Sequence, residues 1–456
     1  MELNKILEKQ RKFFQTGATL SVDFRIEKLK LLRDVIKDYE QEIACALKQD
    51  LGKSPFESFM CETGLVLEEL SFMIKNIKKL SAEKAVHTPL INFTSKSYTK
   101  AVPYGNTLII SPWNYPFLLT MGPLTDALAA GNTAMIKPSK TSLATTKVMG
   151  KIIRACFKED YVFLADKDID KARDLINQKF DFIFFTGSSA VGKEVLISAA
   201  QNITPVVLEL GGKSPCIVDK SANIKLAAKR IVFGKFLNCG QTCVAPDYVL
   251  CHKSIVKELE RELCVQTEKQ YGSNPFQNKN YGKIINEKHF ERLLGLIDKA
   301  KVLIGGKARK ETLQITPTVL TGITWQDKIM QKEIFGPLLP VLTFDNIEEI
   351  IEILNNKPKP LALYLFSNDK YTIKEITSRV QYGGGCINDT VIHLATTQMG
   401  FGGVGQSGMG SYHGKAGFKT FSHTKSIVDK KNWIDFPVRY SPYKKIYLKL
   451  LHFLLK

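Results

Sequence analysis

The chain lacks the long apolar runs that mark secreted or membrane-spanning proteins. No run of about 18 apolar residues occurs, and the N-terminus from Met1 to Phe14 has no uninterrupted apolar stretch of the kind that a secretory signal needs. The nine cysteines are an odd number without regular spacing, which favours reduced thiols over a disulfide framework. We therefore expect a cytoplasmic protein in which any special cysteine has a chemical role.

Acidic residues are fewer than basic ones, 45 against 64, so that the formal net charge is +19. Such a surface attracts nucleotides, anionic lipid or nucleic acid. A nucleic-acid-binding protein would need basic stripes interleaved with aromatic residues, or a helix-turn-helix pattern, and neither is present. Nucleic-acid binding is therefore a distant alternative. The 456 residues, 44% of them hydrophobic, suffice for a large core and about three domains of ~150 residues each.

The order of apolar patterns predicts an α/β protein. Apolar residues at three- and four-residue spacing between 3 and 79 predict a helical N-terminal region. Short apolar runs then alternate with helical stretches such as 141–157 and 190–201, which is typical of parallel βαβ units. A second α/β unit follows Pro215. The predicted strands are 107–110, 133–136, 181–185, 206–210, 216–218, 248–251, 338–344 and 361–366.

Three segments fit neither α/β unit. Residues 94–102 and 417–428 carry little core signal, and we expect both to form arms. Residues 444–456 place Ile446, Leu450 and Phe453 on one helical face, with lysines beside it. This amphipathic helix is too short to span a membrane. It is expected either to pack over the body or the active-site entrance, or to touch anionic lipid loosely.

The densest chemical signal is the hexapeptide from Asn238 to Cys243, which holds two cysteines four residues apart. No second Cys or His pair with zinc-ligand spacing follows, so a metal site is disfavoured. A buried, inert thiol remains an alternative. A thiolate is the strongest nucleophile among common side chains near neutral pH, so a catalytic cysteine is the favoured interpretation.

Two polar residues at the ends of predicted strands are candidates for the same chemistry. Glu209 precedes a glycine pair, where a carboxylate can act as a general base toward water, although a lone Glu there is often only solvated. Asn114 lies between Pro112 and Pro116, which fix the backbone around it. It can be a simple turn residue, or a fixed amide donor for a developing oxyanion.

Two loops suggest a nucleotide site. The segment from Phe182 to Gly192 runs from a strand through a glycine turn into a helix start, although it lacks the full G-x-G-x-x-G pattern. A plain strand-turn-helix is the alternative. Exposed N–H groups at that helix start can bind a pyrophosphate. Lys137 and Lys140 follow another strand and add two cations nearby.

Taken in order, these motifs resemble the aldehyde dehydrogenase superfamily from about residue 14 to 443. The spacing of Asn114, Glu209 and Cys243, and the tail segment from Gly410 to Phe418, are similar to the class 3 branch. The resemblance implies that Cys243 forms a thiohemiacetal and then a thioester, while Cys239 does not attack. Asn114 and the backbone N–H of Cys243 would hold the oxyanion. Glu209 would activate the water that hydrolyses the thioester.

The resemblance also implies NAD or NADP as cofactor, and no metal. Glu333 and Phe335 would position the nicotinamide ribose, and Lys137 would contact the adenosine ribose. Where the family commonly has Glu, this chain has Lys140, so we expect NADP to be used at least as well as NAD. The remaining expected cofactor contacts are Trp113, Gly187, Ser188, Ser189, Ala190, Val191, Gly192 and Leu210.

The implied fold is a Rossmann-type cofactor domain at 1–208, an α/β catalytic domain at 209–400, and a bridging oligomerisation arm with the C-terminal helix at 401–456. A strand at about 84–102 would belong to the arm. A homodimer is expected, acting on a medium or long aliphatic, or aromatic, aldehyde, with weak peripheral membrane contact through the C-terminal helix as an option. The alternative is an acylating enzyme that passes the thioester to coenzyme A or another thiol, or a reductase. Glu209 favours hydrolysis.

Overall fold

The computed structural model describes residues 3–165 and 171–455, and its N-terminal region is helical as predicted. Apolar side chains such as Leu29, Leu32 and Ile36 recur on one face of these helices and are buried. Among the described residues, no helix is long and apolar enough to cross a membrane. The helices are α1 (Leu3–Gln15), α2 (Val22–Asp38), α3 (Glu40–Leu51), α4 (Pro55–Ser58) and α5 (Gly64–Ser81), with a π-helical turn, η2 (Phe59–Thr63), between the last two.

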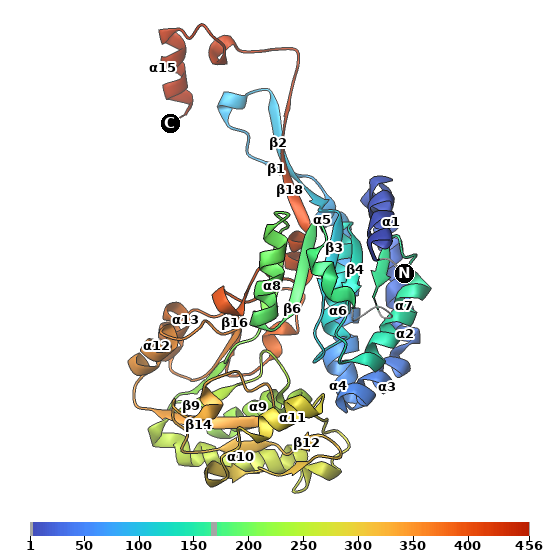
Figure 1. Cartoon of the computed structure of the whole chain (residues 1–456). Helices are drawn as coiled ribbons and strands as arrows, with labels where there is room; N and C mark the ends of the chain where they lie inside the picture. The colour runs from blue at the N-terminus through green and yellow to red at the C-terminus, as the bar shows by residue number, and fades with distance from the viewer. Residues whose placement is uncertain (1–2, 166–170, 456) are drawn as a thin grey trace.

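The first sheet has six strands, and the helices flank it in Figure 1. Its strands run parallel except for β17. The parallel strands are apolar runs, as expected for a sheet that is covered on both faces. The helices α6 (Leu118–Ala130), α7 (Leu143–Cys156) and α8 (Ser189–Ala200) connect or follow its strands. The strand order is β17 (Gly408–Met409), β7 (Val206–Leu210), β6 (Phe182–Gly187), β3 (Asn106–Ile110), β4 (Thr133–Lys137) and β5 (Val162–Leu164).

The second sheet has seven strands and lies below the first in Figure 1. Only β10 runs antiparallel to its neighbour. Its order is β10 (Val302–Ile304), β13 (Thr318–Leu320), β14 (Leu338–Phe344), β9 (Tyr248–His252), β8 (Pro215–Val218), β15 (Ala362–Phe366) and β16 (Gly384–Ile387). The accompanying helices are α9 (Ile224–Phe236), α10 (Val256–Tyr271), α11 (Glu287–Leu294), α12 (Ile347–Asn355) and α13 (Lys370–Arg379), and a hairpin of β11 (Ala308–Arg309) and β12 (Gln314–Ile315) stands apart.

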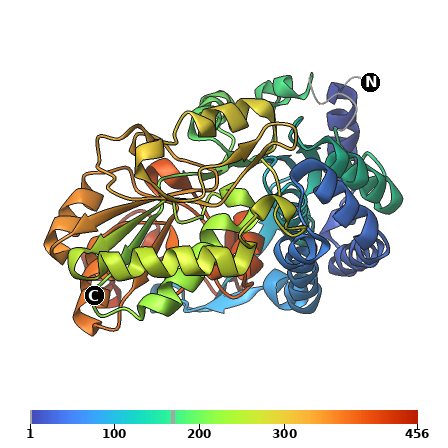
Figure 2. The ribbon, with the colours of Figure 1, turned by 90° about the horizontal axis from the view of Figure 1, so that it is seen from below.

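The eight strands expected from the sequence are all present, within one or two residues of their predicted bounds. The strands of the two large sheets and the hairpin that were not predicted, such as β5, β13 and β16, have only two to four residues. Such short runs carry no measurable periodicity. Seen from below, in Figure 2, the second sheet and its helices lie side by side with the N-terminal helices.

The arm is a three-stranded antiparallel sheet of β1 (Lys84–Val86), β2 (Ser95–Pro103) and β18 (Ser422–Lys430). It rises from the body in Figure 1, with α15 (Lys445–Leu454) at its far end; Lys456 lies outside the described residues. The second arm segment was expected to begin near residue 417, and this start was wrong, because residues 414–420 form helix α14 (Gly414–Thr420). Phe418 on that helix is buried in the core, so the segment packs against the body before the strand begins.

Candidate active site

Cys243 lies in a loop whose backbone is unusually constrained. The loop follows α9, and three consecutive residues, Asn238, Cys239 and Gly240, adopt positive φ angles of 51°, 52° and 71°. At Gly240 a Cβ atom would lie 2.3 Å from the carbonyl oxygen of Gly336, so only glycine fits there. Non-glycine residues in this region are strained, and the surrounding contacts must hold them.

Cys243 lies in the wall between two cavities. The first cavity, of about 160 Å³, is lined almost entirely by apolar side chains, including Met60, Leu65 and Phe233. The second, of about 300 Å³, is lined by Asn114, Glu209 and other polar residues. Cys243 and Leu119 contribute to both. The thiol therefore borders an apolar cavity and a second cavity that also holds ionisable and amide side chains, as a nucleophile between two different ligands would.

The environment of Cys243 disfavours its thiolate. Burial, and then the nearby carboxyl groups of Glu333 and Glu209, raise the pKa of the Cys243 thiol to about 12. The backbone N–H groups of Cys243 and Val244 act in the opposite direction, because they hydrogen-bond to the sulfur. At neutral pH the thiol of the free protein is thus protonated. Its ionisation requires a base or an added positive charge.

Glu209 is placed at the edge of the second cavity by β7. Its side chain is only 3% exposed, and neither carboxyl oxygen has a hydrogen-bond partner within the described chain. Burial raises the pKa of Glu209 well above its usual range. A carboxyl group in this state is a stronger base once it has lost its proton, and it has room to bind water in the cavity.

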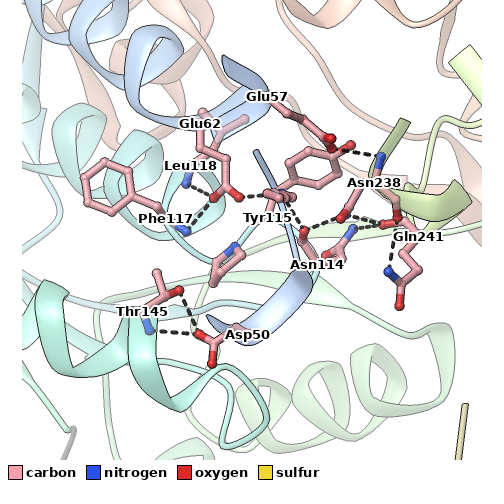
Figure 3. A network of polar contacts seen from close by, with 12 residues as sticks. Asp50, Glu57, Glu62, Asn114, Tyr115, Phe117, Leu118, Thr145, Asn238 and Gln241 are labelled. Carbon is pink, nitrogen blue, oxygen red and sulfur yellow. Dashed lines mark hydrogen bonds and ion pairs between the residues drawn. The ribbon is translucent and has the colours of Figure 1, made fainter. Parts of the chain in front are cut away.

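Asn114 is held rigidly beside the cysteine loop (Figure 3). It is 3% exposed and its Nδ2 donates to the backbone carbonyl of Gln241 over 3.0 Å. Its own backbone carbonyl accepts from Nζ of Lys53 at 3.1 Å and from Nδ2 of Asn238 at 2.8 Å. One amide N–H of Asn114 is already engaged, and the second is free for a ligand in the cavity that Asn114 lines.

The second cavity also gathers half of the residues that the sequence suggested for a dinucleotide. At Gly187 a Cβ atom would lie 2.6 Å from the Phe185 ring, and at Gly192 it would lie 2.7 Å from Leu210. These glycines let the backbone approach closely at the start of α8, where Ser188 is the N-cap residue. From the predicted set, the cavity is lined by Trp113, Gly187, Ser188, Leu210, Glu333 and Phe335.

Glu333 lies against the glycine pair Gly211 and Gly212, and Phe335 follows it two residues later. The backbone N–H of Gly212 donates to Glu333 over 3.2 Å, and burial, followed by the charge of Asp247, raises the pKa of Glu333 to about 8. Phe335 has a φ of 49° and packs edge-on against Trp113 at 5.5 Å. At Gly211 a Cβ atom would lie 2.4 Å from a carboxyl oxygen of Glu333, so a larger residue there would displace that carboxyl group. The closely approaching backbone, the carboxyl group of Glu333 and the two aromatic rings together fit a nicotinamide dinucleotide. That cofactor accepts a hydride when it is bound.

Other expected residues lie away from the second cavity. Ser189 and Ala190 line a neighbouring cavity of about 680 Å³ that shares Glu333 with it. Val191 directly follows Ala190 in the first turn of α8, and Lys137 ends β4. Lys140 is exposed and lies three residues after Lys137, in the loop that follows β4. Cys239 is buried near Gly282 and lines neither of the two cavities that share Cys243.

Several lining residues were not predicted from the sequence. His289 and Arg292 line the second cavity, and His289 packs against Trp113 with ring centroids 5.1 Å apart. They lie on α11, which has no motif in its sequence. Tyr412 and His413 line the apolar cavity and belong to the tail segment that carried the resemblance, which was the one available signal.

Comparison with known proteins agrees with this geometry. A profile described as the aldehyde dehydrogenase family matches residues 1–427. The chain belongs to the aldehyde dehydrogenase family. It is 46% identical to 4,4'-diaponeurosporen-aldehyde dehydrogenase of Staphylococcus aureus (95% of each chain) and 40% identical to "Aldehyde dehydrogenase, dimeric NADP-preferring" of Canis lupus familiaris (94% of each). A solved structure titled "Substrate bound state of Staphylococcus Aureus AldH" superposes with a TM-score of 0.98 at 43% identity, covering 100% of both chains.

Family membership confirms the predicted fold and the general activity. The protein is an NAD(P)-dependent aldehyde dehydrogenase, and the cysteine-thioester mechanism is general to the family. Relatives named as family 3 members in Rattus norvegicus and Mus musculus, 39% and 40% identical, confirm the resemblance to class 3.

Proposed function

We propose that Cys243 of this aldehyde dehydrogenase is the nucleophile, with the aldehyde in the apolar cavity and the cofactor in the second cavity, which holds Glu209 and Glu333. The single observation that carries this is the position of Cys243 in the wall that both cavities share. The sulfur, once a base has taken its proton, adds to the aldehyde carbon, and the carbonyl oxygen becomes an oxyanion. A bound NAD(P) would accept the hydride whose loss turns this adduct into the thioester. The free amide N–H of Asn114 and the backbone N–H of Cys243 donate to that oxygen.

We propose that Glu209 then serves the hydrolytic half of the reaction. Its carboxylate takes a proton from a water molecule, whose oxygen adds to the thioester carbon, and the thiolate of Cys243 leaves as the acid is released. Burial without a hydrogen-bond partner supports this role, since such a carboxylate is a strong base. If the acyl group were instead transferred to coenzyme A or another thiol, no water would be activated, and Glu209 would have no role as the base for it.

For the cofactor we propose that Glu333 and Phe335 orient the nicotinamide ribose, while Gly187, Ser188 and Gly192 approach the pyrophosphate. The helix N-terminus after Ser188 supports an anion there. Trp113, Leu210, Ser189, Ala190 and Val191 complete the contact surface. Lys137 would reach the adenosine ribose, and Lys140 would favour a 2′-phosphate. The relative named NADP-preferring supports that preference.

The apolar cavity favours a medium or long aliphatic, or an aromatic, aldehyde. Its walls include Leu118, Val391 and Phe401, and such side chains bind hydrocarbon without directional contacts. The compound for which the Staphylococcus aureus relative is named belongs in the same substrate panel. The test is NAD(P)H formation over aldehydes of graded chain length and ring type. Efficiency that falls as the chain lengthens would contradict this substrate class.

We propose a cytoplasmic homodimer in which the arm and the C-terminal helix bridge two copies. The sheet of β2 and β18 leaves the body, and α15 carries exposed apolar residues, among them Ile446, Leu450 and Phe453. This helix is expected to cover the entrance to the partner's apolar cavity or to make weak contact with anionic lipid. Deletion after Tyr443 should alter chain-length preference or liposome co-sedimentation, and no change in either would contradict both roles. The division at 1–208, 209–400 and 401–456 remains a proposal.

A further inference from the structure

Three ionisable side chains from the N-terminal helical region are buried behind the active site. Lys53 and Glu62 are 0% exposed, and Glu57 is 8% exposed. A charge removed from water is costly unless close partners replace the water. The contacts of these three residues lead directly to Asn114 and to the cysteine loop.

Lys53 has three partners for its three N–H donors. Its ammonium group forms an ion pair with Glu62, donates to the backbone carbonyl of Asn114 at 3.1 Å, and lies 3.8 Å from the centre of the Tyr115 ring. The orientation of the Asn114 peptide is thus tied to a fixed, buried cation.

Glu62 holds the other end of the same turn. It lies in the π-helical turn η2, and its second oxygen accepts from the backbone N–H groups of Phe117 at 2.8 Å and Leu118 at 3.2 Å, where α6 begins (Figure 3). A carboxylate at a helix N-terminus is favourable because it satisfies N–H groups that lack a helical partner. Lys53 and Glu62 together hold the turn from residue 114 to 118 at both ends.

Glu57 holds the cysteine loop. Its Oε1 accepts from the backbone N–H of Asn238 at 2.9 Å, at the first of the strained positive-φ residues. The Asn238 side chain donates onward to the carbonyls of Asn114 at 2.8 Å and Gln241 at 3.2 Å. Figure 3 shows Glu57 and Asn114 on either side of Asn238. The turn and the loop are therefore joined through buried hydrogen bonds.

We propose that Lys53, with its partner Glu62, and Glu57 are positioning residues: they hold the Asn114 amide and the Cys243 loop in the relation that oxyanion binding requires. This inference rests on the proposed role of Asn114. A displacement of about 1 Å in such a site lowers the rate about 100-fold. Neither Lys53 nor Glu57 lines a cavity that contains Cys243, so they act through the residues that they hold.

The first experiment is a double-mutant cycle. Lys53→Met combined with Glu62→Gln removes both charges together, which avoids leaving one buried ion unpaired. We expect kcat/KM for an aldehyde to fall about 10- to 100-fold, while the Kd for NADPH stays within about twofold. In an Asn114→Ala background the same pair of substitutions should add less than about threefold, because the group that they position is gone.

The outcomes separate the inference from the function on which it rests. If Asn114→Ala alone leaves kcat/KM unchanged, the oxyanion role of Asn114 is wrong, and the positioning role is wrong with it. If Asn114→Ala lowers kcat/KM but the Lys53 and Glu62 substitutions then lower it by their full factor again, only the positioning inference is overturned.

A second set of variants guards against simple loss of folding. Glu57→Leu removes the acceptor for Asn238, whereas Glu57→Gln keeps a carbonyl oxygen there and should restore most of kcat/KM. Asp50→Leu is the matched control for Glu57→Leu, because Asp50 also receives backbone N–H groups at a helix start, from Ala144 and Thr145, but does not touch the site (Figure 3). The Asp50 variant should lose thermal stability without a fall in kcat/KM. An equal fall in the Asp50 and Glu57→Leu variants, or no rescue by Glu57→Gln, would overturn the inference.

Discussion

The amide of Asn114 donates from Nδ2 to the backbone carbonyl of Gln241 over 3.0 Å, two residues before Cys243. The residue expected to bind the oxyanion is thus attached to the loop that carries the nucleophile. A movement of the Asn114 side chain would also move the cysteine loop, so Asn114 and Cys243 keep their relative position. The cysteine at the end of this loop is therefore preorganised, while Cys239, earlier in the loop, faces a different core.

The first prediction separates the two cysteines of the loop. Cys243→Ser should abolish dehydrogenase activity, because a hydroxyl is a poor substitute for a thiolate. Cys239→Ser should keep much of it, since Cys239 is buried away from both cavities. Steady-state NAD(P)H formation by variants with matched circular dichroism spectra is the measurement. Equal loss in both would mean that the nucleophile is misassigned.

A second prediction concerns the order of steps. Glu209→Gln should still give a burst of NAD(P)H of about one equivalent per site and then turn over at least about 100-fold more slowly, because only the water-activating step needs the carboxylate. Stopped-flow absorbance resolves the two phases. If the burst itself disappears, Glu209 acts before hydrolysis. If an added thiol restores fast turnover, the blocked step is deacylation, as proposed.

The sequence predicted the strands and the three central candidates because each is a local pattern. The apolar runs can be recognised from neighbouring residues alone, and Cys243, Glu209 and Asn114 each lie in a short motif. Lys53, Glu57 and Glu62 could not be found in this way. In sequence they are charges on or beside helices, which are usually solvated. Lys53 and Glu62 lie nine positions apart, but the other partners of the three side chains lie 55 to 181 positions away. The apolar cavity beside Cys243 was equally hidden, since its walls come from distant loops and helices.

The third prediction concerns Lys235, the fully buried lysine of α9 whose Nζ has no hydrogen-bond partner among the described residues. Burial lowers the pKa of Lys235 to about 8 from the usual 10.5. The unfolded chain then binds more protons between pH 8 and 10.5, so stability rises with pH across that window. Lys235→Met should raise the thermal midpoint at pH 7 and flatten this dependence.

Exposed Lys225 on the same helix provides the control for Lys235. Lys225→Met should leave both the midpoint and its pH dependence unchanged, because an exposed lysine loses no solvation on folding. Calorimetry from pH 7 to 10.5 measures both quantities. A lower midpoint for Lys235→Met at pH 7 would contradict the prediction and would indicate that the ammonium group has a stabilising partner in solution.

The fourth prediction follows from the thiol of Cys243, whose pKa burial raises to about 12. Alkylation of the free enzyme by iodoacetamide should be slow at pH 7 and rise about tenfold per pH unit up to pH 10, because only the thiolate reacts. Adding oxidised cofactor should accelerate the reaction, since a positive charge beside the sulfur favours its ionisation. Mass spectrometry of the labelled Cys243 peptide, with Cys243→Ser as background, gives the rate. A plateau near pH 8.5 would contradict the prediction.

The last prediction concerns the cofactor and Lys140, an exposed residue in the loop after β4. A glutamate there would accept hydrogen bonds from ribose hydroxyls and repel a 2′-phosphate, whereas lysine reverses both effects. A unit charge pair at ~4 Å contributes roughly 1 kcal/mol in water and ~4 kcal/mol at an effective dielectric constant of about 20. Lys140→Glu should therefore lower the NADP/NAD ratio of kcat/KM about tenfold or more, with salt reducing the effect. Lys374→Glu on α13 makes the same charge change far along the chain and should leave the ratio unchanged. An unchanged ratio in Lys140→Glu, or an equal fall in Lys374→Glu, would mean that Lys140 does not select the cofactor.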